Sequence, residues 1–465
     1  MADTPWQGDA CSLVEAFRSG ERSPVEELEA TQQAIDASTL NAFSHLDPDG
    51  ARKVAESADV SLPFGGVPLG IKELDSVDGW PDTDACVVLK DRVASYTATH
   101  IDRLRAAGTV PVGMTTASEF GGVNLTRTVL NGITRNPWNE EKTPGGSSGG
   151  TGSAVAGGLI TLGTGGDGGG SIRIPAGFCG LVGLKTTYGR IPRGPHMAIG
   201  ALTVTIGGLT RSVRDTARWL DVANGADTHD PHSLPRIDGW EDGLSSHGDE
   251  LRGMRVAIID DFAGAVVAPE AAKLVRASGE ALVADLGLKL VDLDVDIPSV
   301  GTAWSLANMA GTFRELGDAW PDCAEDLTPE IHFACKWAEE KGLDFGAIIK
   351  LEQRRTALFE AMANMFDQVD FVITSTNPDG AFAAEGPLPN TFGGIKDTPN
   401  NNGKLTIPSN LYGNPAISIP VGEVDGLPIG LQMLGRHHSD ALLLDAALTS
   451  ERERPWAVVA PGSPL

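Results

Sequence analysis

The sequence predicts an α/β protein built as one large unit with insertions rather than as separable domains. An amphipathic segment at 99–108 ends at Gly108 and leads directly into the apolar segment TVPVGMT. A helix followed at once by a strand is typical of α/β proteins. Buried-strand patterns recur at 253–261 and 366–376. The 465 residues contain no internal repeat of fixed period and no long linker.

The other elements can be predicted in chain order, beginning with a helix at 23–36. Ser23 is its expected N-cap, Pro24 suits the first helical position, and Glu26 completes a capping box. Strands are predicted at 65–77, 159–163, 414–422 and 428–435, helices at 151–158, 274–287, 344–366 and 439–453, and a long surface loop at 227–250.

Composition and charge narrow the class of protein. A net charge of −26 disfavours binding to nucleic acid or to an anionic membrane. The N-terminus has no signal-peptide pattern, and the longest apolar runs are shorter than the ~20 residues of a membrane span, so a cytoplasmic protein is predicted. The nine histidines lack HExxH spacing, and neither a metal nor a cofactor is expected. The cysteines never form a CxxC pair, which indicates reduced thiols at Cys11, Cys86, Cys179, Cys323 and Cys335.

The segment GTGGDGGGSIRIP (163–175) contains six glycines and needs a special explanation. A phosphate-binding loop is disfavoured because GxxxxGK[ST] does not occur. Gly163, Gly165 and Gly168 satisfy the dinucleotide pattern GxGxxG after an apolar run. However, the acidic residue expected about 20 positions later is absent from GLKTTYGR.

Acyl transfer is the third interpretation of the glycine segment. Ser147 lies in a formal GxSxG match, but the polar residues WNEEKTP precede it where a nucleophile elbow needs a strand. Ser171 follows three glycines whose N–H groups could converge on one oxyanion. Lys72 is either a snorkelling surface residue or a buried amine with a lowered pKa, and the buried form would supply a base.

Several blocks in order resemble the amidase signature family. PGGSSGG (144–150), D-x-GGSIR-x-PA (167–176) and CGLVGLK (179–185) are similar to its paired glycine-serine blocks. Further similar blocks, within a resemblance that runs from about residue 66 to 450, are GVPLGIKE (66–73), RNPWN (135–139), GR (189–190) and YGNPAISIPVG…DGLPIGLQMLGR (412–436). Departures from the family pattern at Met114, Gly166 and Thr186 lie outside the catalytic positions.

The resemblance implies an amidase signature fold, with one large mixed β-sheet covered by helices on both faces. It also implies a single amidase domain over 1–465. The expected parts are a helical N-terminal segment at about 1–60, a signature core at about 66–215, a variable substrate-pocket region at about 227–400, and C-terminal strands and a helix at about 405–455.

For the site, the resemblance implies a Ser–cis-Ser–Lys triad in which Ser171 is the nucleophile, Ser147 the proton relay and Lys72 the base. The N–H groups of the glycine loop would hold the oxyanion, namely those of Gly168, Gly169, Gly170 and Ser171. Three supporting residues are expected: Ser148 as a local hydrogen-bonding residue, Asp167 as an anchor of the glycine loop, and Arg173 as the partner of a nearby carboxylate.

We therefore expect a stand-alone amidase that hydrolyses the C–N bond of small to medium, largely apolar amides through an acyl-enzyme, and that also accepts esters or carbamates. Pocket walls are expected from Trp304 to Phe313 and from Asn377 to Phe392. A homodimer is left open. The alternatives are an amidotransferase-type subunit that works with partner chains and, less favoured, a dinucleotide-binding or non-catalytic binding protein.

Overall fold

One large mixed sheet organises the protein in the computed structural model, which describes residues 4–196, 203–342 and 345–464. Within these residues eleven strands follow one another in the order β1 (Phe43–Leu46), β3 (Val110–Thr115), β2 (Pro68–Lys72), β6 (Leu162–Asp167), β8 (Thr205–Thr210), β7 (Val182–Lys185), β14 (Ala416–Val424), β15 (Leu427–Gly435), β11 (Phe371–Ser375), β9 (Arg255–Ile258) and β10 (Lys289–Leu290).

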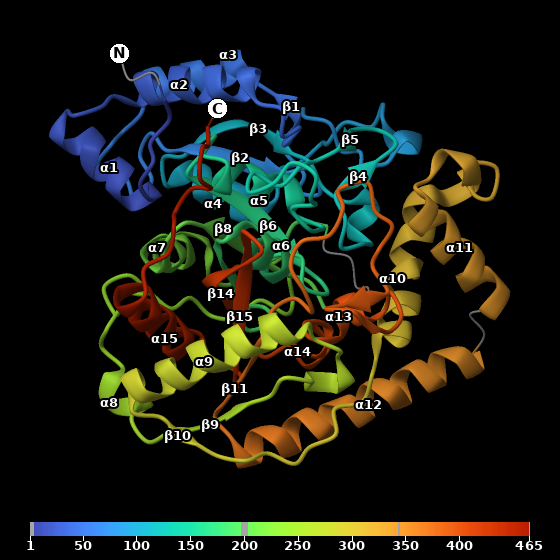
Figure 1. Ribbon diagram of the computed structural model, residues 1–465. Helices are drawn as coiled ribbons and strands as arrows, with labels where there is room; N and C mark the ends of the chain where they lie inside the picture. The colour runs from blue at the N-terminus through green and yellow to red at the C-terminus, as the bar shows by residue number, and fades with distance from the viewer. Residues whose placement is uncertain (1–3, 197–202, 343–344, 465) are drawn as a thin grey trace.

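The sheet combines parallel and antiparallel pairs. β2 runs parallel to β3 and β6, and β9 runs parallel to β10 and β11, whereas the other neighbouring strands are antiparallel. Strands from the first half and from the last part of the chain meet near the middle of the sheet, where β7 pairs with β14. The mixed sheet that the sequence predicted is therefore confirmed (Figure 1).

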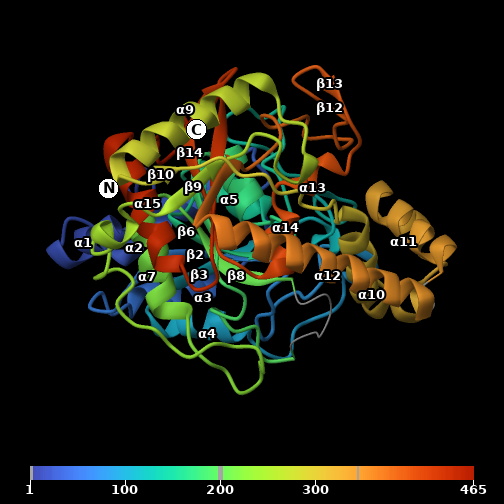
Figure 2. The same cartoon turned by 90° about the horizontal axis from the view of Figure 1, so that it is seen from below.

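Helices cover both faces of the sheet, as predicted, and each face has its own apolar core (Figure 2). Strand β11 illustrates the alternation, since Phe371 and Ile373 belong to one core and Val372 to the other. The first face carries α1 (Ala10–Ser19), α4 (Thr99–Ala106), α7 (Val213–Ala223), α9 (Pro269–Leu286) and α15 (Asp440–Glu453). The second carries α2 (Pro24–Ala37), α3 (Pro48–Glu56), α5 (Gly149–Ala156), α6 (Arg173–Cys179), α12 (Phe345–Gln368) and α14 (Ile407–Tyr412).

Two further helices, α10 (Gly301–Leu316) and α11 (Pro329–Lys341), pack against each other at one side of the molecule (Figures 1 and 2). The remaining short elements are β4 (Arg127–Thr128), β5 (Gly132–Ile133), α8 (Gly248–Leu251), β12 (Thr391–Phe392), β13 (Ile395–Lys396) and α13 (Asn401–Lys404). No helix in the described part of the chain is long and apolar enough to cross a membrane.

Local sequence explains why several elements begin and end where they do. The capping box of α2 is present, because Ser23 Oγ accepts from the Glu26 N–H at 3.2 Å and the Glu26 carboxylate accepts from the Ser23 N–H at 2.8 Å. Asp425 and Gly426 join β14 to β15 with φ of 53° and 75°, the left-handed conformations that an Asp-Gly hairpin turn requires.

The glycine segment differs from the expected strand-then-loop arrangement, because β6 continues through it to Asp167. Within the strand, Gly163 and Gly165 face the small-residue helix α5. A Cβ atom on Gly163 would lie 2.4 Å from Thr151 Cγ2, and one on Gly165 would lie 3.2 Å from Ser148 Oγ. The first glycines of the GxGxxG pattern thus allow α5 to pack closely on the strand, which explains the pattern without a dinucleotide.

Candidate active site

Lys72 is the last residue of β2, and its side chain is almost completely buried, with 2% of its surface exposed. Its Nζ donates hydrogen bonds to Ser147 Oγ at 2.7 Å and to the Gly166 carbonyl oxygen at 3.3 Å. Its backbone N–H donates to Thr164 Oγ1 at 2.9 Å, which fixes the end of the strand. Of the two interpretations of Lys72, the structure therefore supports the buried amine.

Burial lowers the pKa of Lys72 from 10.5 to about 8, against the opposing effect of the carboxylates of Asp75, Asp167 and Glu73. A lysine with this pKa is neutral in about one molecule in ten at pH 7, compared with roughly one in three thousand at the ordinary value. The environment thus supplies the free amine that a general base must be.

Ser147 follows a cis peptide bond, Gly146–Ser147, as the resemblance implied. Its carbonyl oxygen accepts from the Ser118 N–H at 3.1 Å. The backbone at Gly146 passes so close to its surroundings that a Cβ atom there would lie 2.5 Å from Ser118 Oγ. These contacts fix the position from which Ser147 Oγ meets Lys72.

Asp167 contacts the glycine loop, and Arg173 is its ion-pair partner. The Arg173 Nε lies 2.9 Å from Asp167 Oδ2, and both side chains are fully buried. The carboxylate also accepts from the Gly170 N–H at 2.7 Å and from Asn410 Nδ2 at 2.8 Å. Burial opposes ionisation of Asp167, but Arg173 and the hydrogen bonds from Arg173 and Asn410 outweigh it and hold its pKa well below the ordinary value.

Two side chains from distant parts of the chain hold the carbonyl groups of the loop. Trp304 Nε1, on α10, donates to the Gly168 oxygen at 2.7 Å. Thr406 Oγ1 donates to the Gly169 oxygen at 2.6 Å. Neither contact could be predicted from a local pattern, since the partners are 136 and 237 residues apart.

The structure corrects the expectation for one amide of the oxyanion hole. The N–H group of Gly170 is engaged by Asp167, so it does not point freely toward a substrate. The N–H groups of Gly168, Gly169 and Ser171 donate to no other group in the described residues. Three of the four expected N–H donors therefore remain available for an oxyanion.

Ser148 also differs from expectation. Its buried hydroxyl has no hydrogen-bond partner among the described residues, so it does not support the loop in the predicted way. Ser148 instead caps α5 through its backbone, because its carbonyl oxygen accepts from the Gly152 N–H at 3.0 Å.

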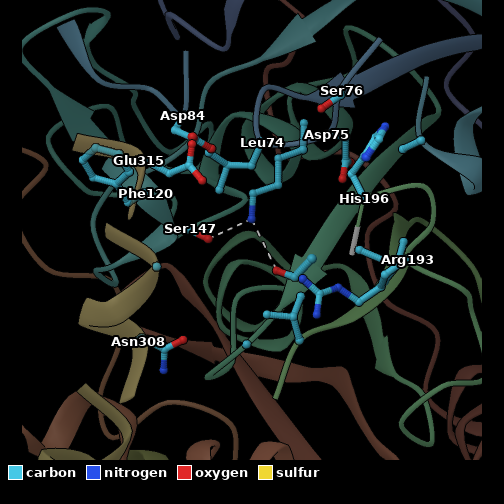
Figure 3. Close-up of a pocket in the computed structure, with 18 of the residues that line it drawn as sticks. Leu74, Asp75, Ser76, Asp84, Phe120, Ser147, Arg193, His196, Asn308 and Glu315 are labelled. Atoms are coloured by element: carbon cyan, nitrogen blue, oxygen red, sulfur yellow. Dashed lines mark hydrogen bonds between the residues drawn. The ribbon is translucent and has the colours of Figure 1, made fainter. Parts of the chain in front are cut away.

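Ser171 lines two cavities. Ser147 also lines the larger one, where Figure 3 shows it. The larger cavity has a volume of about 390 Å³ and the smaller about 130 Å³. No hydrogen bond joins Ser147 to Ser171 in the described residues. Trp304 lines both cavities, together with Gly121 and Gly122.

The predicted pocket walls are only partly found. The α10 segment lines the larger cavity through Trp304, Asn308, Met309, Gly311 and Thr312. In the expected loop 377–392, Leu388 lines the smaller cavity. The other described residues of this loop line neither of the two cavities. Sequence reasoning missed the charged groups of the larger cavity, although Asp75 in GIKELD and Arg193 in GRIPRGP adjoin the resembling blocks.

The larger cavity is charged rather than apolar. Arg92 lies at its edge and binds three carboxylates, those of Asp82 at 3.2 Å, Asp84 at 2.5 Å and Glu315 at 2.7 Å. Figure 3 shows Asp84 and Glu315 together at one side of the cavity and Arg193 and His196 at the other. Purely apolar substrates would leave these groups facing an unsuitable surface.

One cluster of the described residues has the spacing of metal ligands, namely Asp9 and Cys11 at the start of α1 and Asp215 in the first turn of α7. Asp215 already accepts from the N–H groups of Ala10 and Cys11 at 3.0 and 2.9 Å. Burial raises the pKa of the Cys11 thiol, with Asp215 adding to the effect, so the thiolate that a metal needs is disfavoured. The cluster is explained by helix capping.

The chain is similar to known proteins over nearly its whole length. The amidase family model matches residues 26–444. A glutamyl-tRNA(Gln) amidotransferase subunit from Chloroflexus aurantiacus is 34% identical over 96% of both chains. A bacterial aryl acylamidase described as an amidase signature enzyme superposes with a TM-score of 0.90, at 27% identity over 99% of both chains. The 6-aminohexanoate cyclic dimer hydrolase, complexed with substrate, gives 0.86 at 29% identity over 98% of this chain and 99% of that one.

Proposed function

The chain belongs to the amidase signature family, whose enzymes act on C–N bonds, and on this basis we propose that it is a stand-alone amidase using a Ser171 acyl-enzyme. One observation carries the proposal. Lys72, with a pKa lowered to about 8, hydrogen-bonds at 2.7 Å to Ser147, and Ser147 lines the same cavity as Ser171. A lysine base and its hydroxyl partner thus line the same cavity as an accessible serine.

The reaction begins with proton transfer along the triad. Neutral Lys72 takes the proton of Ser147, which takes that of Ser171 as Ser171 Oγ attacks the amide carbonyl carbon. The proton then passes back through Ser147 to the leaving nitrogen, and the C–N bond breaks. Water attacks the acyl-enzyme with the same groups as base, which releases the acid and restores Ser171.

The oxyanion of the tetrahedral intermediate is held by the N–H groups of Gly168, Gly169 and Ser171. In a trans peptide the C=O and N–H bonds point in opposite directions. The hydrogen bond from Trp304 to the Gly168 oxygen therefore directs the Gly169 N–H away from Trp304. Each well-aligned donor is worth about 3 kcal/mol in the transition state.

The substrate is a small to medium amide that spans both cavities. The smaller cavity is mainly apolar and includes Ile174, Leu388 and Ile407, so the apolar part of the substrate belongs there. The larger cavity, with its charged walls, receives a polar part. Esters and carbamates are expected as further substrates, since the same donors serve any acyl carbonyl.

A second candidate function is that of an amidotransferase subunit. The 34% identity to the glutamyl-tRNA(Gln) amidotransferase subunit of Chloroflexus aurantiacus, over nearly the full length of both chains, favours it. The two candidates differ in their need for partner chains. A stand-alone amidase turns over amides as the purified chain, whereas a subunit of this kind would act only with its partners.

The test is turnover of a panel of anilides, alkyl amides, esters and carbamates by the purified chain, with release of the amine or alcohol measured directly. We expect measurable turnover that is lost in Ser171→Ala. The matched control is Ser148→Ala, because the Ser148 hydroxyl has no partner among the described residues and this variant should keep its activity. Turnover that survives in Ser171→Ala would reject the proposed nucleophile, and no turnover without added partner chains would favour the second candidate.

A further inference from the structure

Arg193 is a charged group of the larger cavity that the reaction does not use. Two cations of this lining, Lys72 and Arg193, have no carboxylate within ion-pair distance in the described residues. Lys72 is accounted for, since its lowered pKa lets it lose its charge. An arginine guanidinium keeps its charge at any pH that the protein survives.

The carboxylates of the cavity are already engaged by other groups. Asp82, Asp84 and Glu315 surround Arg92, and Glu315 also lies 2.6 Å from Arg314. A separate contact holds Asp75, whose Oδ2 accepts from Thr164 Oγ1 at 2.8 Å and lies 3.4 Å from His100 Nε2. None of these carboxylates lies within ion-pair distance of the Arg193 guanidinium in the described part of the protein.

The immediate surroundings of Arg193 that the structure describes provide no ion-pair partner either, although Asp230 and Asp75 favour its charge from farther away. The Asp230 carboxylate accepts from the backbone N–H groups of Arg193 and His232, both at 2.9 Å, and makes no ion pair with the Arg193 guanidinium in the described residues. Tyr188 favours the charged form of the Arg193 guanidinium, but its side chain is a neutral phenol at physiological pH and supplies no negative charge. Burial lowers the pKa of Arg193, with Tyr188, Asp230 and Asp75 opposing, which means that its charge is poorly solvated.

In Figure 3 the Arg193 side chain extends toward the middle of the cavity, across from Asp84 and Glu315. A poorly solvated cation facing an open cavity favours an anion supplied from outside. The planar guanidinium matches a carboxylate with two parallel hydrogen bonds. A monoanion fits better than a phosphate dianion, because the acidic groups around Arg92 lie across the same cavity and would repel the second charge.

We propose that Arg193 binds a carboxylate carried by the substrate, so that the enzyme prefers amides with an anionic group on the part that occupies the larger cavity. This inference rests on the proposed function and specifies its substrate class. The substrate then has an apolar part in the smaller cavity, the scissile carbonyl at Ser171, and a carboxylate at Arg193.

Matched substrates test the proposal through kcat/KM. One pair differs on the acyl side, N-(4-nitrophenyl)butanamide against N-(4-nitrophenyl)succinamic acid, and the other on the amine side, N-butanoylaniline against N-butanoyl-4-aminobenzoate. We expect the acid of at least one pair to be preferred. Arg193→Met should lower kcat/KM for the preferred acid by about 10- to 100-fold and change kcat/KM for its neutral partner less than threefold. Arg193→Lys should keep part of the preference, since it retains the charge but not the planar fork.

The control is Arg276→Met, which removes the same charge from an exposed pair with Asp260 and should leave the preference unchanged. The proposal is overturned if neither acid is preferred, or if Arg193→Met slows both members of a pair equally. Calorimetry separates this outcome from a failure of the proposed function. The Ser171→Ala variant should bind the preferred acid more tightly than its neutral partner, and adding Arg193→Met should remove that difference whether or not the wild-type protein turns the amide over.

Discussion

Replacement of Lys72 by methionine should abolish activity and, at the same time, stabilise the protein near neutral pH. Burial lowers the pKa of Lys72 from 10.5 to about 8, and this shift costs the folded state about 3 kcal/mol at pH 7. Methionine has a similar length and carries no charge, but the hydrogen bond to Ser147 is lost, which costs about 1 kcal/mol. We therefore expect Lys72→Met to raise the free energy of unfolding by about 2 kcal/mol at pH 7.

The pH dependence gives this prediction a sign that can be checked. A lowered pKa in the folded state means that the unfolded chain binds the extra proton between about pH 8 and 10.5. The wild-type protein therefore gains stability as the pH rises through this window, and the advantage of Lys72→Met should shrink. Urea unfolding at pH 7 and pH 10, with amide turnover of the same samples, measures both effects. The prediction fails if the variant is less stable than wild type at pH 7 or still turns over amides.

Other changes test separate parts of the site. Asp75→Asn removes a carboxylate that raises the pKa of Lys72, so the acid limb of kcat/KM, expected near pH 8 in the wild type, should move down by about one unit; an unmoved limb would contradict this. Trp304→Phe deletes the hydrogen bond that holds the glycine loop and should lower kcat about tenfold with little change in KM, whereas a rise in KM alone would mean a packing role. Asp167→Asn leaves Arg173 buried without a counter-charge and should lower the free energy of unfolding by about 3–5 kcal/mol in denaturant titrations; a loss below about 1 kcal/mol would show that the pair is dispensable.

The sequence was most informative where structure depends on local chemistry. The capping box of α2 and the Asp425–Gly426 turn could be predicted because neighbouring residues determine them. The end of β6 could not be predicted in this way, because local sequence rules assign the glycines of 163–166 to a loop. They form a strand because β8 pairs with them and α5 needs their missing side chains to pack closely.

In the site, too, the features set by neighbouring residues could be predicted, and those set by distant segments could not. Lys72 could be identified as a candidate base from an apolar stretch of a few residues, although only the fold reveals that it is buried beside Ser147. The hydrogen bond from Trp304 to the loop and the ion pair between Arg92 and Glu315 depend on contacts between distant segments. A single sequence does not encode such pairings in any local pattern.

Covalent labelling of the purified chain tests the assignment of Ser171 as nucleophile without any knowledge of the substrate. The protein would be treated with a fluorophosphonate, digested, and the modified residue located by mass spectrometry. We predict a single modification on Ser171, slower at low pH as Lys72 becomes protonated and absent from Ser171→Ala. Modification of Ser147 or Ser148 in place of Ser171, or amide turnover by a protein that never labels at Ser171, would contradict this assignment.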